Sequence, residues 1–204
     1  MGTCGGGGPC SGGGMFGIEC VEPQPPPPPA SEVSTGPAVV KTFAETMNCN
    51  TDAQGVIGSL EAHFSQFANY SGFFGPLGLP AAYANASFGN TPIAKNATIP
   101  ISLTVFTTAS IFPIGFSNVS VTVSSVSSTS FSFVTNPGHV LNPASIAFSA
   151  SNVGNGRVSF AVGVVGDFAS STAAAGYYAG GRNLEANIWN HLLKAVEDFC
   201  NKNH

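Results

Sequence analysis

The stretch NLEANIWNHLLKAVEDFC, residues 183–200, decides the fold because its apolar side chains recur every four positions. Asn183 supplies a side chain that caps a first helical turn. Five residues follow the spacing and three others widen the stripe that they form: Leu184, Ile188, Leu192, Val196 and Cys200, with Trp189, Leu193 and Phe199. This pattern predicts a long amphipathic helix, whose stripe must pack on another apolar surface of the protein.

A sheet with one apolar face is predicted to supply that surface. Upstream of the helix, apolar residues alternate with Ser, Thr or other small residues at a period of two. This period is typical of antiparallel strands that bury one face and expose the other. Turn pairs such as Pro137-Gly138 and Asn155-Gly156 separate the segments. The strands are expected at residues 39–47, 83–88, 98–106, 119–123, 131–133, 146–148 and 158–164.

A second helix is expected near the start of the domain. Asn50, Thr51 and Asp52 offer N-cap chemistry. After them, apolar residues stand three and four positions apart between Val56 and Phe67. Residues 69–80 are rich in Gly, Pro and aromatic side chains and predict a loop. The resulting order is strand, helix, about six strands and a long helix, so the fold class is α+β.

Residues 1–38 differ from the rest of the chain in composition. They hold ten Gly and eight Pro but no Lys or Arg, and residues 25–29 are all proline. Such a segment cannot bury enough apolar surface to order itself. The sequence therefore predicts a disordered leader over residues 1–38 and one domain over residues 39–204.

Composition and motifs exclude several classes of function. The net charge is −4 and the six Lys and Arg residues are scattered, so we expect no nucleic-acid partner. No run approaches the roughly 18 apolar residues of a membrane-spanning helix. The sequence contains no G-x-S-x-G, H-E-x-x-H, P-loop or dinucleotide fingerprint. It therefore predicts no cofactor, metal or catalytic residue, and a protein without enzymatic activity is favoured over an enzyme.

The five cysteines include no C-x-x-C pair. Cys4, Cys10 and Cys20 belong to the leader, and Cys49 and Cys200 belong to the predicted domain. A bridge between the last two would tie the start of the domain to its end. Two separate buried thiols fit the sequence equally well.

The central part of the domain is almost free of charge. Between Lys95 and Arg157 there is no Asp, Glu, Lys or Arg, and His139 is the single histidine there. A sheet without charges can line an apolar cavity at little desolvation cost, and small-molecule pockets are mostly apolar with a few polar groups. A solid core with a Ser- and Thr-rich outer face is the alternative. His139, which follows a Pro-Gly turn at a strand end, is the polar side chain placed best to face such a cavity.

The order of elements resembles the helix-grip architecture of START and Bet v 1-like (SRPBCC) domains. Within that group, FSFVTNPGH at residues 131–139, IAF at 146–148, Gly156 and VSF at 158–160 resemble the DUF1990 pattern. The resemblance implies a curved antiparallel sheet of about six or seven strands around a long C-terminal helix, with a cavity between them. It implies binding of a hydrophobic small molecule or lipid there, by His139, Phe131, Phe133, Phe148, Phe160 and Leu192.

The leader suggests a second interpretation. Its Gly- and Cys-rich stretch, with FGIEC at residues 16–20, resembles the variable tails of bacterial Rhs-type repeat proteins. That resemblance implies a structural or interaction module with a solid core, at the end of a larger exported protein. It favours an exported or extracellular location over a cytoplasmic one.

Overall fold

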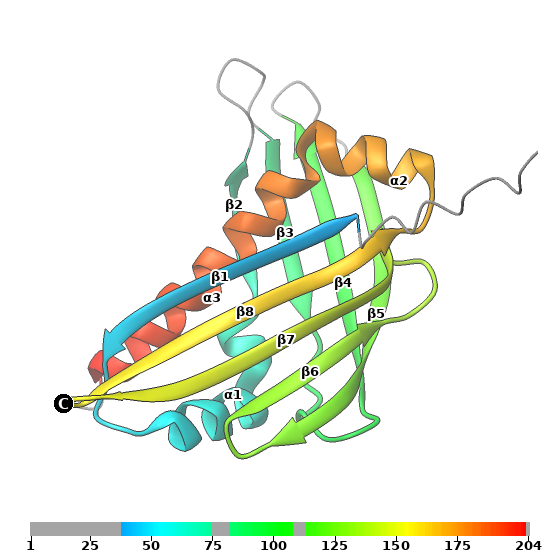
Figure 1. The fold of residues 1–204 in the computed structure, drawn as a ribbon. Helices are drawn as coiled ribbons and strands as arrows, with labels where there is room; N and C mark the ends of the chain where they lie inside the picture. The colour runs from blue at the N-terminus through cyan, green and yellow to red at the C-terminus, as the bar shows by residue number, and fades with distance from the viewer. Residues whose placement is uncertain (1–37, 75–81, 108–112, 203–204) are drawn as a thin grey trace, which may run out of the picture. The chain divides into compact units, whose positions relative to one another are not determined.

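The computed structural model describes residues 38–74, 82–107 and 113–202. These residues form one antiparallel sheet of eight strands in the order β1-β8-β7-β6-β5-β4-β3-β2, together with helices (Figure 1). The strands are β1 (Val39–Asn48), β2 (Tyr70–Phe74), β3 (Ala82–Phe88), β4 (Thr98–Thr107), β5 (Pro113–Ser127), β6 (Ser130–Thr135), β7 (Leu141–Gly154) and β8 (Arg157–Phe168). The helices are α1 (Ala53–Ala68), α2 (Ser171–Gly176), the π-helical turn η1 (Tyr177–Gly181) and α3 (Arg182–Lys202).

The strongly curved sheet wraps around α3, which crosses its concave face (Figure 1). The predicted α+β fold class, a curved antiparallel sheet packed on a long C-terminal helix, is confirmed. The predicted leader, with its three cysteines, lies outside the described residues except for Ala38.

The predicted loop over residues 69–80 is wrong at its start, because residues 70–74 form β2. This strand pairs with β3 in a register that joins Tyr70 to Ala86 and Phe74 to Ala82. The neighbouring strand gives the segment its extended shape, whereas the local composition, with Gly72 in the middle, indicates a loop. Residues 75–81 lie outside the described part of the chain.

Helix α1 begins where the capping residues predict it. The Asp52 carboxylate accepts a hydrogen bond from the Gly55 amide at 2.9 Å, which satisfies one of the unpaired donors of the first turn. The residues of the predicted stripe point into the protein, and Ile57 and Leu60 are fully buried. His63 is exposed on the opposite side and takes no part in the core.

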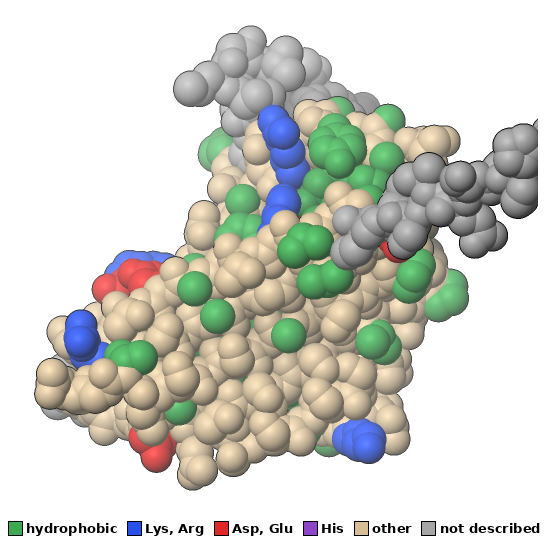
Figure 2. Space-filling view, viewed as in Figure 1, with side chains coloured by type: hydrophobic (Ala, Val, Ile, Leu, Met, Phe, Trp, Pro, Cys, Tyr) green, Lys and Arg blue, Asp and Glu red, His purple; other side chains and the backbone are tan. Residues whose placement is uncertain are grey.

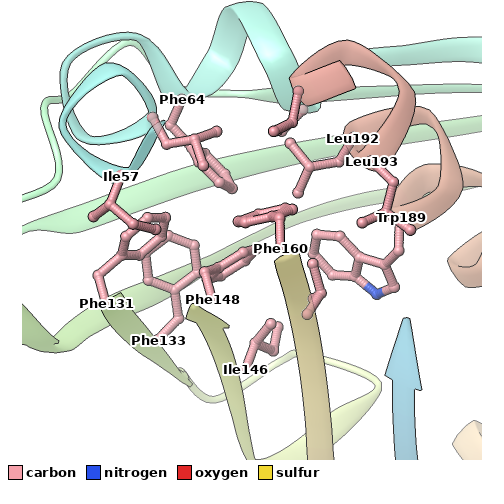
Figure 3. Close-up of a cluster of buried hydrophobic side chains, with 14 of the residues drawn as sticks. Ile57, Phe64, Phe131, Phe133, Ile146, Phe148, Phe160, Trp189, Leu192 and Leu193 are labelled. Carbon is pink, nitrogen blue, oxygen red and sulfur yellow. The ribbon is translucent and has the colours of Figure 1, made fainter. Parts of the chain in front are cut away.

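An aromatic cluster fills the space between α1 and the middle of the sheet. The Phe64 ring makes edge contacts with the rings of Phe88, Phe131, Phe133 and Phe148 at centroid distances between 5.3 and 5.8 Å. Figure 3 shows Phe64 with Phe131, Phe133 and Phe148. Edge-to-face pairs of this kind add to the free energy of apolar burial. This half of the domain is therefore a packed core.

A disulfide bond fixes the far end of α3. It joins Cys200, which is fully buried, to Cys49, which directly follows β1. The Cys49 amide also donates to the carbonyl oxygen of Gly156 in the β7–β8 turn, at 2.8 Å. Of the two arrangements that the sequence leaves open, the structure has the bridge.

The convex side of the sheet carries few Lys, Arg, Asp or Glu side chains (Figure 2). On β5 and β6 the hydroxyl groups bond to one another, as in the pair Ser125 and Ser132 at 2.6 Å. None of the helices in the described ranges is both long enough and apolar enough to cross a bilayer.

Candidate binding site

A pocket of about 200 Å³ lies between the sheet and the N-terminal half of α3. Strands β3 to β8 supply one wall, and η1 and α3 supply the other. Most of its lining is aliphatic or aromatic, as with Leu103 on β4, Ile146 on β7 and Ile188 on α3. The uncharged segment recognised in the sequence provides most of this wall.

Two of the six side chains expected to bind a ligand line this pocket, namely His139 and Phe133. The other four lie in the packed core, each with 1% of its surface exposed or less: Phe131, Phe148, Phe160 and Leu192. The rings of Phe131 and Phe148 stack on one another with centroids 4.6 Å apart, and Phe64 of α1 packs against both. The sequence predicts α1 but not which part of the concave face this helix fills.

His139 stands at the end of the turn between β6 and β7. Gly138 adopts a positive φ of 95°, a conformation that glycine tolerates, and so directs the chain around this turn. The imidazole Nδ1 lies 3.0 Å from the Leu141 carbonyl oxygen and 3.2 Å from the Leu141 amide nitrogen, and the tautomer of the ring decides which of the two it bonds. Burial lowers the pKa of His139, and the Leu141 backbone and the Glu185 carboxylate oppose this shift only in part. The ring is therefore neutral at pH 7.

Three residues that the sequence analysis did not select form a polar group beside the pocket. The Glu185 carboxylate accepts a hydrogen bond from the Tyr177 hydroxyl at 2.5 Å and pairs with the Lys41 ammonium at 2.8 Å through the same oxygen, Oε2. Lys41 also lies 4.9 Å from the centre of the Tyr177 ring. Tyr177 and Glu185 line the pocket, whereas Lys41 belongs to β1.

The state of these groups follows from their surroundings. Burial and the hydrogen bond to Glu185 raise the pKa of Tyr177 far above its ordinary value, so the phenol keeps its proton and remains a donor. Tyr177 is in the π-helical turn η1, a geometry that is frequent at functional sites. The spacing of Lys41 and Glu185, 144 residues apart, gives no local sequence signal for the pair.

Trp189 completes the polar end of the pocket. It follows Glu185 by four positions on α3, so both side chains lie on the same side of the helix. Its indole nitrogen is buried and has no hydrogen-bond partner among the described residues. Figure 3 shows this nitrogen on the edge of the ring that is turned away from Leu192 and Leu193. A buried donor without an acceptor costs about 1–3 kcal/mol.

The arrangement is suited to binding. Within the described ranges, no three His, Cys, Asp or Glu side chains are grouped as a metal site requires. The other polar lining residue, Thr135, has its hydroxyl occupied, since it accepts from the Ala144 amide at 3.0 Å. The pocket thus combines a long apolar wall with a short polar end.

We expect His139 to make the stability of the domain depend on pH. Because its pKa in the folded state is lowered, the unfolded chain binds a proton more readily, and stability is lost as the pH falls below about 6.5. Urea unfolding at pH 7.5 and 5.5 should therefore show a smaller loss of stability in His139→Gln than in the wild type. Equal losses in both proteins would contradict this prediction.

Comparisons with known proteins agree with the fold. No family model and no curated protein sequence matches the chain. Among solved structures, protein Ms6760 from Mycobacterium smegmatis is similar with a TM-score of 0.51 and 11% identity, over 81% of this chain and 92% of that one. A START superfamily protein from the same organism gives a TM-score of 0.45 and 12% identity, over 81% and 99% of the two chains.

The architecture of the described domain confirms the predicted resemblance to START and Bet v 1-like proteins as a resemblance of fold. The described domain has the sheet, the long C-terminal helix and the order of elements that the helix-grip architecture requires. The finer resemblances, to DUF1990 and to Rhs-type tails, stay predictions.

Proposed function

We propose that this protein binds a small hydrophobic molecule in the pocket between the sheet and α3. One observation carries the proposal: the pocket of about 200 Å³ is walled almost entirely by apolar side chains, on a sheet segment without charged residues. Such a wall offers a ligand dispersion contacts and removes its apolar surface from water, without leaving a charge unpaired.

The size of the pocket limits the ligand. A volume of about 200 Å³ is below the roughly 300–1,000 Å³ of pockets for drug-sized molecules. Burial of about 200 Å² of apolar ligand surface contributes roughly 5 kcal/mol at about 25 cal/mol per Å². The loss of translational and rotational freedom offsets part of this gain, so affinities weaker than about 1 μM are expected for purely apolar ligands.

Filling the pocket should abolish binding. Leu103 lines the pocket from β4, and Leu103→Trp places a larger side chain there. The neutral dye N-phenyl-1-naphthylamine should bind the full-length wild type saturably, and we expect the variant to bind it at least about tenfold more weakly. Dye fluorescence in a titration measures both affinities.

The matched control is Val134→Trp. Val134 is 39% exposed on β6 between buried Phe133 and Thr135, so its side chain projects from the other face of the sheet. This variant should bind the dye as the wild type does. If the wild type takes up no dye, and native mass spectrometry of the full chain shows a bare mass with neutral apolar ligands, the proposal fails. The structural or interaction module would then be favoured.

A further inference from the structure

The polar end of the pocket has unused hydrogen-bonding capacity of two kinds. The two partners of Glu185, Lys41 and Tyr177, both bind to Oε2, so Oε1 is left as an acceptor without a partner among the described residues. One donor is left as well, the buried indole N–H of Trp189.

These groups belong to the same part of the pocket. Glu185 and Trp189 lie one turn apart on α3, and His139 reaches the pocket from the β6–β7 turn. The charge of Glu185 acts on the protonation of His139, which indicates that the carboxylate and the imidazole are near one another. A ligand whose head group lies at this end of the pocket therefore meets the Glu185 acceptor and the Trp189 donor.

The charge of the residues that line the pocket also limits the kind of ligand that can bind. Glu185 is the only ionised group among the described residues that line the pocket, and its side chain is 14% exposed. The neutralising cation, Lys41, is on β1 and is not part of the lining. A ligand carboxylate would face Glu185 without a cation of its own, and like charges at a poorly solvated site repel strongly.

We propose that the pocket selects a neutral apolar alcohol, whose hydroxyl group donates to Glu185 Oε1 and accepts from the indole N–H of Trp189. This inference rests on the proposed function and names the class of ligand. A hydroxyl is the smallest neutral group that both donates and accepts a hydrogen bond. An ether leaves Glu185 Oε1 unsatisfied, a hydrocarbon leaves both Glu185 Oε1 and the Trp189 N–H unsatisfied, and a fatty acid adds a second negative charge.

The test compares three probes of similar length on the full-length protein at pH 7.5, by displacement of N-phenyl-1-naphthylamine. We expect 1-decanol to displace the dye at concentrations about tenfold lower than decanoate, and about fivefold lower than 1-methoxydecane, which lacks the donor hydrogen. In Glu185→Gln, the affinity for decanoate should rise at least about tenfold, because the repulsion is removed and Lys41 is left without its partner. The affinity of the variant for decanol should differ from that of the wild type by less than about threefold.

Glu197→Gln is the matched control. Glu197 is on the same helix, pairs with Lys194 at 2.7 Å and does not line the pocket, so the ratio of decanol to decanoate affinity should stay as in the wild type.

If Glu185→Gln fails to fold, Lys41→Met provides the second test, since loss of the cation should widen the preference for decanol. Equal displacement by decanol and decanoate in the wild type, or an unchanged ratio in Glu185→Gln and Lys41→Met, would overturn the inference but leave dye binding intact. Failure of the dye itself to bind would overturn the proposed function instead.

Discussion

Replacing Phe64 with Ala is expected to lower the free energy of unfolding by about 4 kcal/mol, which is a large part of the stability of a small domain. Phe64 is 2% exposed and joins α1 to the sheet through its four edge contacts with phenylalanine rings. Alanine removes those contacts and leaves a cavity that the sheet cannot close, because its strands are held by hydrogen bonds on both sides. Urea unfolding followed by circular dichroism measures the change.

Phe73→Ala is the control for this prediction. Phe73 is on β2, is 65% exposed and has a ring contact with Tyr83. Its removal should change the free energy of unfolding by about 1 kcal/mol or less. Losses of equal size for Phe64→Ala and Phe73→Ala would show that the aromatic cluster is not the centre of the core.

Removal of the disulfide should have an effect of similar size. Cys49 and Cys200 are 151 residues apart, and closing a loop of that length in the unfolded chain stabilises the folded state by about 5 kcal/mol in the chain-entropy account. Measured values for native disulfides are commonly about 2–5 kcal/mol. We therefore expect the double variant Cys49→Ala, Cys200→Ala to unfold about 3–5 kcal/mol more easily than the oxidised wild type.

A reducing agent provides an independent measurement. Dithiothreitol should lower the urea midpoint of the wild type toward that of the double variant. The midpoint of the double variant itself should not change. Cys4, Cys10 and Cys20 are present in both proteins, so their reduction affects both equally. A wild-type midpoint that does not respond to the reductant would contradict the prediction.

The parts of the fold that could be predicted are those with a regular local pattern. The stripe from Leu184 to Cys200 repeats every four residues, and the strands around Val121 and Val162 alternate every two, so periodicity alone identifies both kinds of element. Strand β2 was missed because five residues with Gly72 at their centre are too short to show a period. Its extended form depends on hydrogen bonds to β3.

The candidate site was predicted only in part, for a related reason. The absence of charge between Lys95 and Arg157 is visible in the sequence, and it identified His139 and the wall of the pocket. The position of α1 on the concave face and the meeting of Lys41 with Glu185 depend on contacts between distant segments. No local pattern carries that information, so the division between packed core and pocket had to come from the structure.

The bridge at the end of α3 also decides how the domain carries mechanical load. Of the described domain, only the residues up to Cys49 and the two after Cys200 lie outside the covalent loop that the bond closes. Tension applied to the two ends would therefore pass along β1 to the sulfur atoms and bypass the rest of the domain. Because β1 is already extended, detaching it adds almost no length, whereas the closed loop would release about 500 Å once its bond is reduced. With the disulfide intact, the domain therefore extends very little under force. Once a reductant breaks the bond, the same domain can unfold into a long extended chain.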